Sequence, residues 1–169
     1  VEAATIVKEK TGEDLKLGTD LNVLCGDCNE EARKVIQQLK KDSEKEKIAV
    51  LAFIDPYTFT NIKWDLWVEL CSLKFVDIIF TFPIQTIERG YKQCKEIDKY
   101  LSPSIVNLLK NYKEIGRVPE DKFEEAYASD ITALVYRSIH HYKVGVRAKS
   151  FDNREIYRTI LFSHCKPAV

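Results

Sequence analysis

The chain has 169 residues, 45% of them hydrophobic, which is enough for one domain with a substantial core. Its 26 basic and 26 acidic residues cancel, so net charge gives no support for binding nucleic acid, although a local basic surface would still allow it. No stretch approaches the roughly 20 apolar residues of a membrane span. The five scattered cysteines suit a reducing cytoplasm better than a disulfide framework, so a cytoplasmic protein without membrane contact is expected.

The N-terminal segment predicts a helix whose beginning is missing. Val1–Lys10 gathers its apolar residues on one face, and Thr11-Gly12 can end the helix. The chain contains no methionine, not even at position 1, so residues before Val1 are expected in the natural protein.

Leu21–Cys25 predicts a short strand, after which Asn29 is expected to cap a helix from Glu30 to about Lys41. Gly26-Asp27 lies between the two, where a carboxylate can accept hydrogen bonds from an adenine amino group or a ribose while glycine lets a ligand approach. The alternative is a plain turn in which Asp27 helps to cap the helix. Both interpretations stay open on sequence alone.

Cys25 and Cys28 have the spacing of a metal or redox motif. A zinc site would need a second pair of ligands, which the chain lacks, so both cysteines are expected to be small buried residues. The only histidines, His140, His141 and His164, are not expected to form a metal site or a catalytic triad. No metal site is therefore predicted.

Two apolar runs, Ile48–Ile54 and Val76–Phe82, have the composition of strands buried on both faces of a parallel sheet. The segment between them predicts a helix from Trp64 to Leu73, so the unit is expected to be strand, helix, strand. We expect the first strand to lie inside the sheet and parallel to the second. The functional interpretation of the residues that follow this strand depends on both expectations.

Asp55-Pro56-Tyr57 follows the first apolar run, and ligands of parallel sheets bind beyond the carboxyl ends of the strands. Proline removes an amide donor and leaves neighbouring carbonyls free to accept from a substrate amine, while Tyr57 can stack on a planar group. The alternative is a turn that merely ends the strand.

The rest of the chain predicts helices and then a hairpin. From Gln85 to about His141 we expect two or three helices, including Asp121–Ala128 and Asp130–Ile139. Tyr142–Arg147 and Tyr157–Ser163 are expected to pair around a turn at Asp152-Asn153. Residues 1–169 thus predict a single α/β domain, Rossmann-like and mainly parallel, with an antiparallel C-terminal strand and a helical insertion at about 85–141.

The order of these features resembles the three-Cys-motif partner protein family, whose members resemble class I S-adenosylmethionine-dependent methyltransferases. The residues that carry the resemblance are Gly26-Asp27-Cys28-Asn29, Ala52–Tyr57, Trp64, Val76–Pro83, Arg89 and the terminal Glu155–Phe162. The resemblance covers most of the chain and implies the methyltransferase-type sheet. The cysteines in the family's name belong to its presumed partner, so Cys25 and Cys28 gain no role from it.

The resemblance also implies site residues. Gly26, Asp27 and Cys28 would bind the adenosine end of S-adenosylmethionine, and Asp55, Pro56 and Tyr57 would lie beside the methyl donor. The glycine-rich loop that should hold the methionine part of the cofactor is absent from these residues. The expected function is methyl transfer, to an amino group of an acceptor that the sequence does not identify. The alternative is a catalytically inactive scaffold that binds a protein or nucleic acid.

Overall fold

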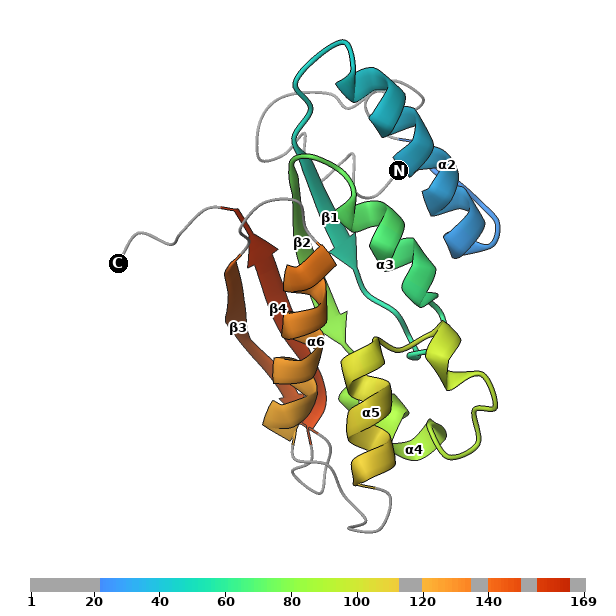
Figure 1. Cartoon of the computed structure of the whole chain (residues 1–169), viewed down its shortest axis with the longest axis vertical. Helices are drawn as coiled ribbons and strands as arrows, with labels where there is room; N and C mark the ends of the chain where they lie inside the picture. Colours follow the sequence, from blue (N-terminus) through green and yellow to red (C-terminus); the bar gives the residue numbers. More distant parts are fainter. Residues whose placement is uncertain (1–21, 113–119, 135–139, 150–154, 165–169) are drawn as a thin grey trace, which may run out of the picture.

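A computed structural model describes residues 22–112, 120–134, 140–149 and 155–164 (Figure 1). The first half of the described chain contains α2 (Cys28–Ser43), β1 (Val50–Ile54), α3 (Trp64–Cys71) and β2 (Val76–Phe82). Next come helix α4 (Ile84–Gly90), the 3-10 turn η1 (Ile97–Lys99), helix α5 (Pro103–Asn111) and helix α6 (Glu120–Leu134). The strands β3 (His140–Lys149) and β4 (Glu155–Ser163) end it.

The described strands form one mixed sheet in the order β1-β2-β4-β3. β1 is parallel to β2, whereas β4 is antiparallel to both β2 and β3. Three of the four strands therefore point the same way, with the terminal strand inserted in the opposite sense. The predictions of an α/β fold, of the parallel strand, helix, strand unit and of an antiparallel C-terminal strand are confirmed at this level. The prediction of a mainly parallel sheet is wrong for the described strands, because two of their three pairings are antiparallel.

The prediction that Ile48–Ile54 lies inside the sheet, buried on both faces, is wrong for the described residues. β1 is an edge strand with β2 as its described neighbour, and its residues alternate between half-buried and exposed. Leu51 and Phe53 are both 66% exposed. The run is apolar at both alternating positions, and that composition cannot reveal how many neighbours a strand has.

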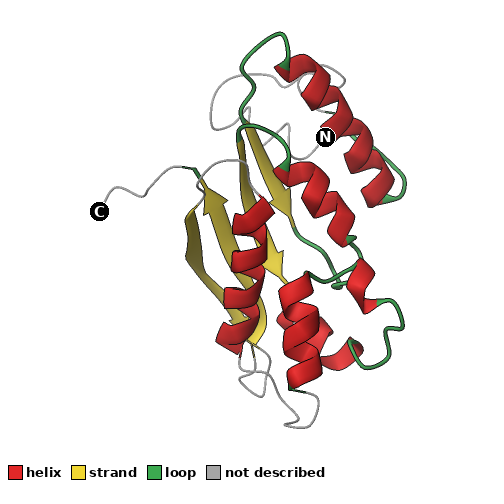
Figure 2. Ribbon diagram, viewed as in Figure 1, coloured by secondary structure: helices red, strands yellow, loops and turns green. Residues whose placement is uncertain are grey.

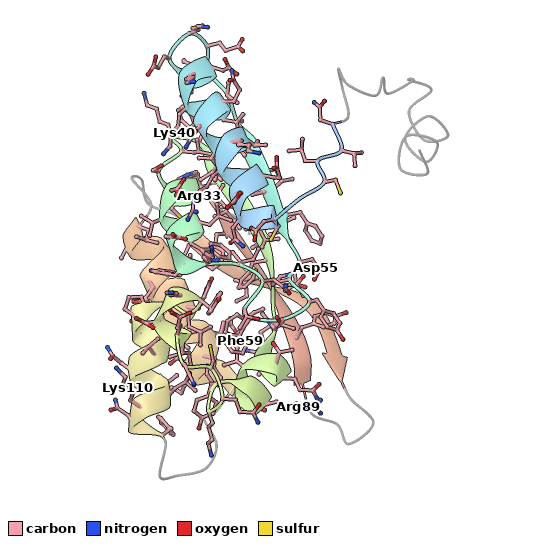
Figure 3. All side chains as sticks on the ribbon, turned by 90° about the vertical axis from the view of Figure 1, so that its right-hand side faces the viewer. Arg33, Lys40, Asp55, Phe59, Arg89 and Lys110 are labelled. Atoms are coloured by element: carbon pink, nitrogen blue, oxygen red, sulfur yellow. The ribbon has the colours of Figure 1, made fainter. Side chains whose placement is uncertain are left out.

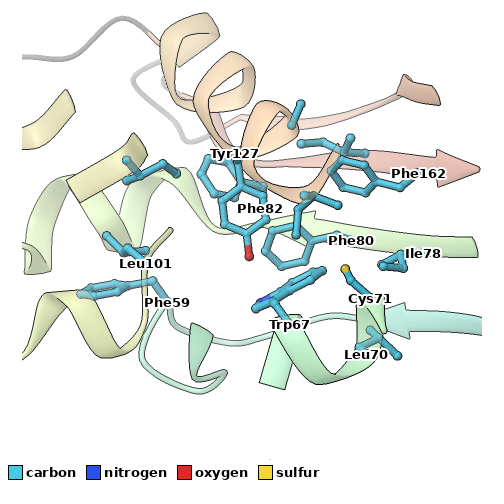
Figure 4. Close-up of a cluster of buried hydrophobic side chains, with 14 of the residues drawn as sticks. Phe59, Trp67, Leu70, Cys71, Ile78, Phe80, Phe82, Leu101, Tyr127 and Phe162 are labelled. Carbon is cyan, nitrogen blue, oxygen red and sulfur yellow. The ribbon is translucent and has the colours of Figure 1, made fainter. Parts of the chain in front are cut away.

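Helices α3 and α6 cover one face of the sheet (Figure 2). An aromatic cluster fills the space between them and β2, with Trp67 edge-on to Phe80 at 4.8 Å between ring centroids and Tyr127 stacked on Phe80 at 5.2 Å (Figure 4). Burial in this cluster raises the pKa of Tyr127 well above its ordinary value. The cluster packs α3 and α6 against β2.

Helix α6 corrects a second prediction, because it is continuous where two helices, Asp121–Ala128 and Asp130–Ile139, were expected. Asp130 does not start a new helix. Its carboxylate accepts hydrogen bonds from the backbone N of Ser104 at 2.8 Å and from Ser104 Oγ at 2.7 Å, and so stabilises the first turn of α5. Asp130 has the chemistry of a helix cap, and its side chain acts on α5 while its backbone continues α6.

The predicted hairpin is present as β3 and β4. On the covered face, Arg158 of β4 pairs with Glu124 of α6, and both side chains are only 2% exposed. The expected helix at Val1–Lys10 and the expected turn at Asp152-Asn153 lie outside the described residues.

Candidate functional site

The start of α2 is fixed by Asp27. Its carboxylate accepts hydrogen bonds from the backbone N of Asn29 at 2.8 Å and of Glu30 at 3.3 Å, which makes Asp27 the N-cap. These bonds, the one from Asn29 first, lower the pKa of Asp27. The prediction that Asn29 caps a helix beginning at Glu30 is therefore wrong by two positions, and the capping alternative for Asp27 matches the structure.

Asn29 instead joins α2 to the loop that follows β1. It is 4% exposed, its Oδ1 accepts from the backbone N of Lys63 at 2.8 Å, and its Nδ2 donates to the carbonyl of Asn61 at 2.9 Å. Cys28 Sγ donates to the same carbonyl at 3.3 Å. Sequence reasoning missed this connection because the partners are more than 30 residues apart and no local pattern marks them.

A cavity of about 630 Å³ lies where α2, β1 and α3 meet. Its wall is mostly apolar and is formed by Ala32, Val35, Ile36 and Leu39 of α2, by Val50 to Ile54 of β1, and by Leu66, Trp67 and Leu70 of α3. Cys28, Asn61 and the run Asp55-Pro56-Tyr57 line the same cavity at the C-terminal end of β1. The structure thus brings together predicted site residues from two segments, but Gly26 and Asp27 are not among the lining residues.

The run Asp55-Pro56-Tyr57 is open to solvent. Asp55 is exposed (Figure 3) and Pro56 is half-buried. The Tyr57 side chain is 91% exposed, so its aromatic ring is available for a ligand to stack on.

The loop after Tyr57 is held from both sides. Thr58 N donates to Asn61 Oδ1 at 2.6 Å, and Phe59 N donates to Thr86 Oγ1 of α4 at 3.2 Å. The Phe59 ring packs against Gly90, where an added Cβ would come within 2.9 Å of Phe59 Cε1. Glycine at position 90 therefore lets the loop that carries Tyr57 rest on α4.

Helix α2 is anchored on α3 through Arg33. Its guanidinium binds Glu69 Oε1 at 2.7 Å and Asp65 Oδ2 at 2.5 Å, and the hydrogen bond to Glu69 is the largest cause of the raised pKa of Arg33 (Figure 3). Together with Asn29, this pair of contacts fixes α2 beside the open edge of β1, so that its apolar stripe forms the outer wall of the cavity.

The cysteine prediction is corrected. Cys25 and Cys28 are both exposed, because α2 begins at the protein surface rather than in the core. The part of the chain that the structure describes holds no group of three or more His, Cys, Asp or Glu side chains able to bind a metal ion. Among the described helices, none is both long and apolar enough to cross a bilayer.

Comparison with known proteins gave no match to a family model, to a curated protein or to a solved structure. The family resemblance therefore stays a prediction. Because β1 is an edge strand among the described residues, its predicted place inside the sheet no longer supports a function, and only its parallel pairing with β2 and the cavity beside it do.

Proposed function

We propose that the cavity binds S-adenosylmethionine and that the chain is a methyltransferase-type protein similar to three-Cys-motif partner proteins. The observation that carries the proposal is the cavity itself: it runs along β1 to the C-terminal end of the strand and combines an apolar wall with Cys28 and Asp55-Pro56-Tyr57. Its volume of about 630 Å³ falls within the range of small-molecule and cofactor sites.

The chemistry of the lining supports this ligand class. The apolar side chains of α2 and β1 suit an adenine ring, and the exposed Tyr57 ring offers a stacking surface for a second planar group. Asp55 can accept a hydrogen bond from an amine that receives the methyl group, and holding that amine in line with the donor supplies most of the rate in such a transfer. Asp27 contributes indirectly, since it caps the helix on which Cys28 lies.

Isothermal titration calorimetry tests the proposal on the whole chain. We expect S-adenosylmethionine and its demethylated product S-adenosylhomocysteine to bind with measurable heat at high micromolar concentrations. Ala32→Phe places a ring in the cavity wall and should abolish the heat, whereas Ala133→Phe, an exposed position on α6 outside the cavity, should not. No binding to the wild-type chain, or equal binding by both variants, would reject the proposal.

A non-catalytic binding scaffold is the second candidate, because one observation favours it. Leu51 and Phe53 are exposed on an edge strand that carries no charge and no proline. Such an edge readily pairs with a strand of another protein. An edge strand without a paired neighbour in the isolated chain would favour this candidate. Amide hydrogen exchange at Leu51 and Phe53 measures whether the edge is paired.

A further inference from the structure

The open edge of β1 presents backbone groups as well as apolar side chains. Val50 N donates to the carbonyl of Phe75, next to β2, at 2.9 Å. Because alternate residues of a strand direct their N–H and C=O groups to the same side, Ala52 and Ile54 also face β2, and the backbone groups of Leu51 and Phe53 face the open edge. Within the described residues no strand accepts these groups.

A second apolar segment is equally uncovered. Asn22–Cys25 directly precedes the cap of α2, and in it Val23 is 75% and Leu24 54% exposed. The segment forms no strand in the structure, which overturns the prediction of a strand at Leu21–Cys25 for the part described, and it projects from the start of α2 (Figure 3). Two uncovered apolar segments thus lie on either side of α2 in the sequence.

The direction of α2 is consistent with a parallel pairing of Asn22–Cys25 with β1. Asn29 binds the loop that follows the end of β1, and the chain beyond Ser43 leads back to the start of β1, so α2 runs antiparallel to β1. A strand entering α2 at Gly26 would therefore point the same way as β1. With 16 residues, α2 exceeds the dozen or so that a crossover between parallel strands requires.

The side chains fit as well. Consecutive strand residues point to opposite faces of a sheet, so of Val23 and Leu24 one would face the apolar stripe of α2 and the other would lie beside Leu51 and Phe53. Helix α2 packs against α3 and overhangs the edge of β1, and Val35 of its stripe is still 42% exposed. A strand paired with this edge would cover Val35 and would occupy the part of the cavity that Val35, Leu51 and Phe53 line, so that a ligand would be confined to the end of the cavity at Asp55-Pro56-Tyr57.

We propose that Asn22–Cys25 docks on the open edge of β1 as a parallel strand, with Gly26 as the hinge. Docking would not require a bound cofactor. It would place Gly26 beside Asp55 at neighbouring strand ends, which is the arrangement in which parallel sheets bind ligands.

Residue-resolved amide hydrogen exchange on the whole chain tests the docking. If the segment docks, the amides of Leu51 and Phe53 exchange on the order of 100-fold more slowly than in an unstructured chain. The double variant Val23→Asp, Leu24→Asp should reduce that protection at least roughly tenfold, while Val68→Asp, which changes another exposed apolar residue, on α3, should not. The amides of Val50 and Ala52, which face β2, report whether the fold is intact.

Three results would overturn the proposal: free exchange at Leu51 and Phe53 in the wild-type chain, protection that the double variant leaves unchanged, or protection that increases with protein concentration. The first result means that the edge of β1 is open, and the second means that another segment covers it. The third means that a second copy of the chain pairs with it. If the double variant also loses protection at Val50, Leu51→Pro decides, since proline removes an edge-facing N–H and spares the bonds to β2. Docking then predicts faster alkylation of Cys25 in that variant, and an unchanged rate contradicts it.

Discussion

Replacing Asn29 with alanine should destabilise the protein more than any change on the exposed face of α2. The side chain is 4% exposed and makes two long-range hydrogen bonds, from Lys63 N at 2.8 Å and to the Asn61 carbonyl at 2.9 Å, besides a weak one to the neighbouring Cys28 Sγ at 3.7 Å. Each bond contributes about 0.5–1.5 kcal/mol, and the unsatisfied Lys63 N–H adds a desolvation cost of about 1 kcal/mol or more. We expect the free energy of unfolding to fall by about 2–4 kcal/mol.

Urea denaturation followed by circular dichroism measures this change, with Gln37→Ala, an exposed position on the same helix, as the matched control. The control should stay within about 0.5 kcal/mol of the wild type, and the melting temperature of Asn29→Ala should fall by about 5–10 °C. A loss below about 0.5 kcal/mol in Asn29→Ala would refute the reasoning, because the link between α2 and the loop would then contribute nothing.

Asn29→Asp separates the two bonds. The carboxylate still accepts from Lys63 N but cannot donate to the Asn61 carbonyl, and it faces that carbonyl with a negative charge. When it is protonated, its O–H can donate again. Relative to the wild type, this variant should therefore regain stability as the pH falls, and a penalty that does not depend on pH would contradict the assigned orientation of the amide.

Three further predictions concern other parts of the chain. Asp27→Ala should lower the melting temperature at pH 7, and Asp27→Asn should lower it much less. Because the cap hydrogen bonds lower the pKa of Asp27, the stabilisation by its charge is present above the ordinary aspartate pKa near 4 and is lost as the pH falls below that value; Asp27→Asn should therefore make the melting temperature less dependent on pH in this range. Glu124→Ala should lower the free energy of unfolding by about 3–5 kcal/mol in urea denaturation, because it removes the carboxylate that pairs with the buried Arg158, whereas the double change Glu124→Leu, Arg158→Met should cost less than the single one. Burial raises the pKa of Cys71 to about 12, so mass spectrometry after iodoacetamide treatment at pH 8 should find Cys71 unmodified and the exposed Cys28 alkylated; rapid reaction of native Cys71 would contradict its burial.

The sequence predicted the features that depend on local chemistry. Val76–Phe82 was assigned with its correct bounds, and the helix from Trp64 was placed within two residues of its end, because apolar periodicity and flanking breakers act over a few positions. Pairing of the last two strands followed from alternation and turn residues. In the candidate site, Asp55-Pro56-Tyr57 was placed correctly at a strand end, since its position in the chain is enough to indicate it.

What the sequence could not predict depends on partners far along the chain. Asn29 looked like a helix cap because the same short polar side chain serves both purposes, and only the fold reveals that Lys63 and Asn61 are its partners. Asp130 was misassigned for the same reason. The Glu124–Arg158 pair joins residues 34 apart in the sequence and has no local signature.

The edge of β1 links the two candidate functions. An uncharged edge strand without proline is an aggregation hazard, so a protein that keeps it must cover it, either with its own chain or with a partner. If Asn22–Cys25 covers it, the edge is unavailable to a partner strand, and the docked segment narrows the cavity along β1 while it brings a second strand end beside Asp55. If the edge is free in the isolated chain, Leu51 and Phe53 remain available for a partner strand. Amide exchange at these two residues and calorimetry with S-adenosylmethionine therefore test different proposals. Protected amides without cofactor binding would support the docking and reject the methyltransferase proposal. Cofactor binding with freely exchanging amides would support the methyltransferase proposal and reject the docking.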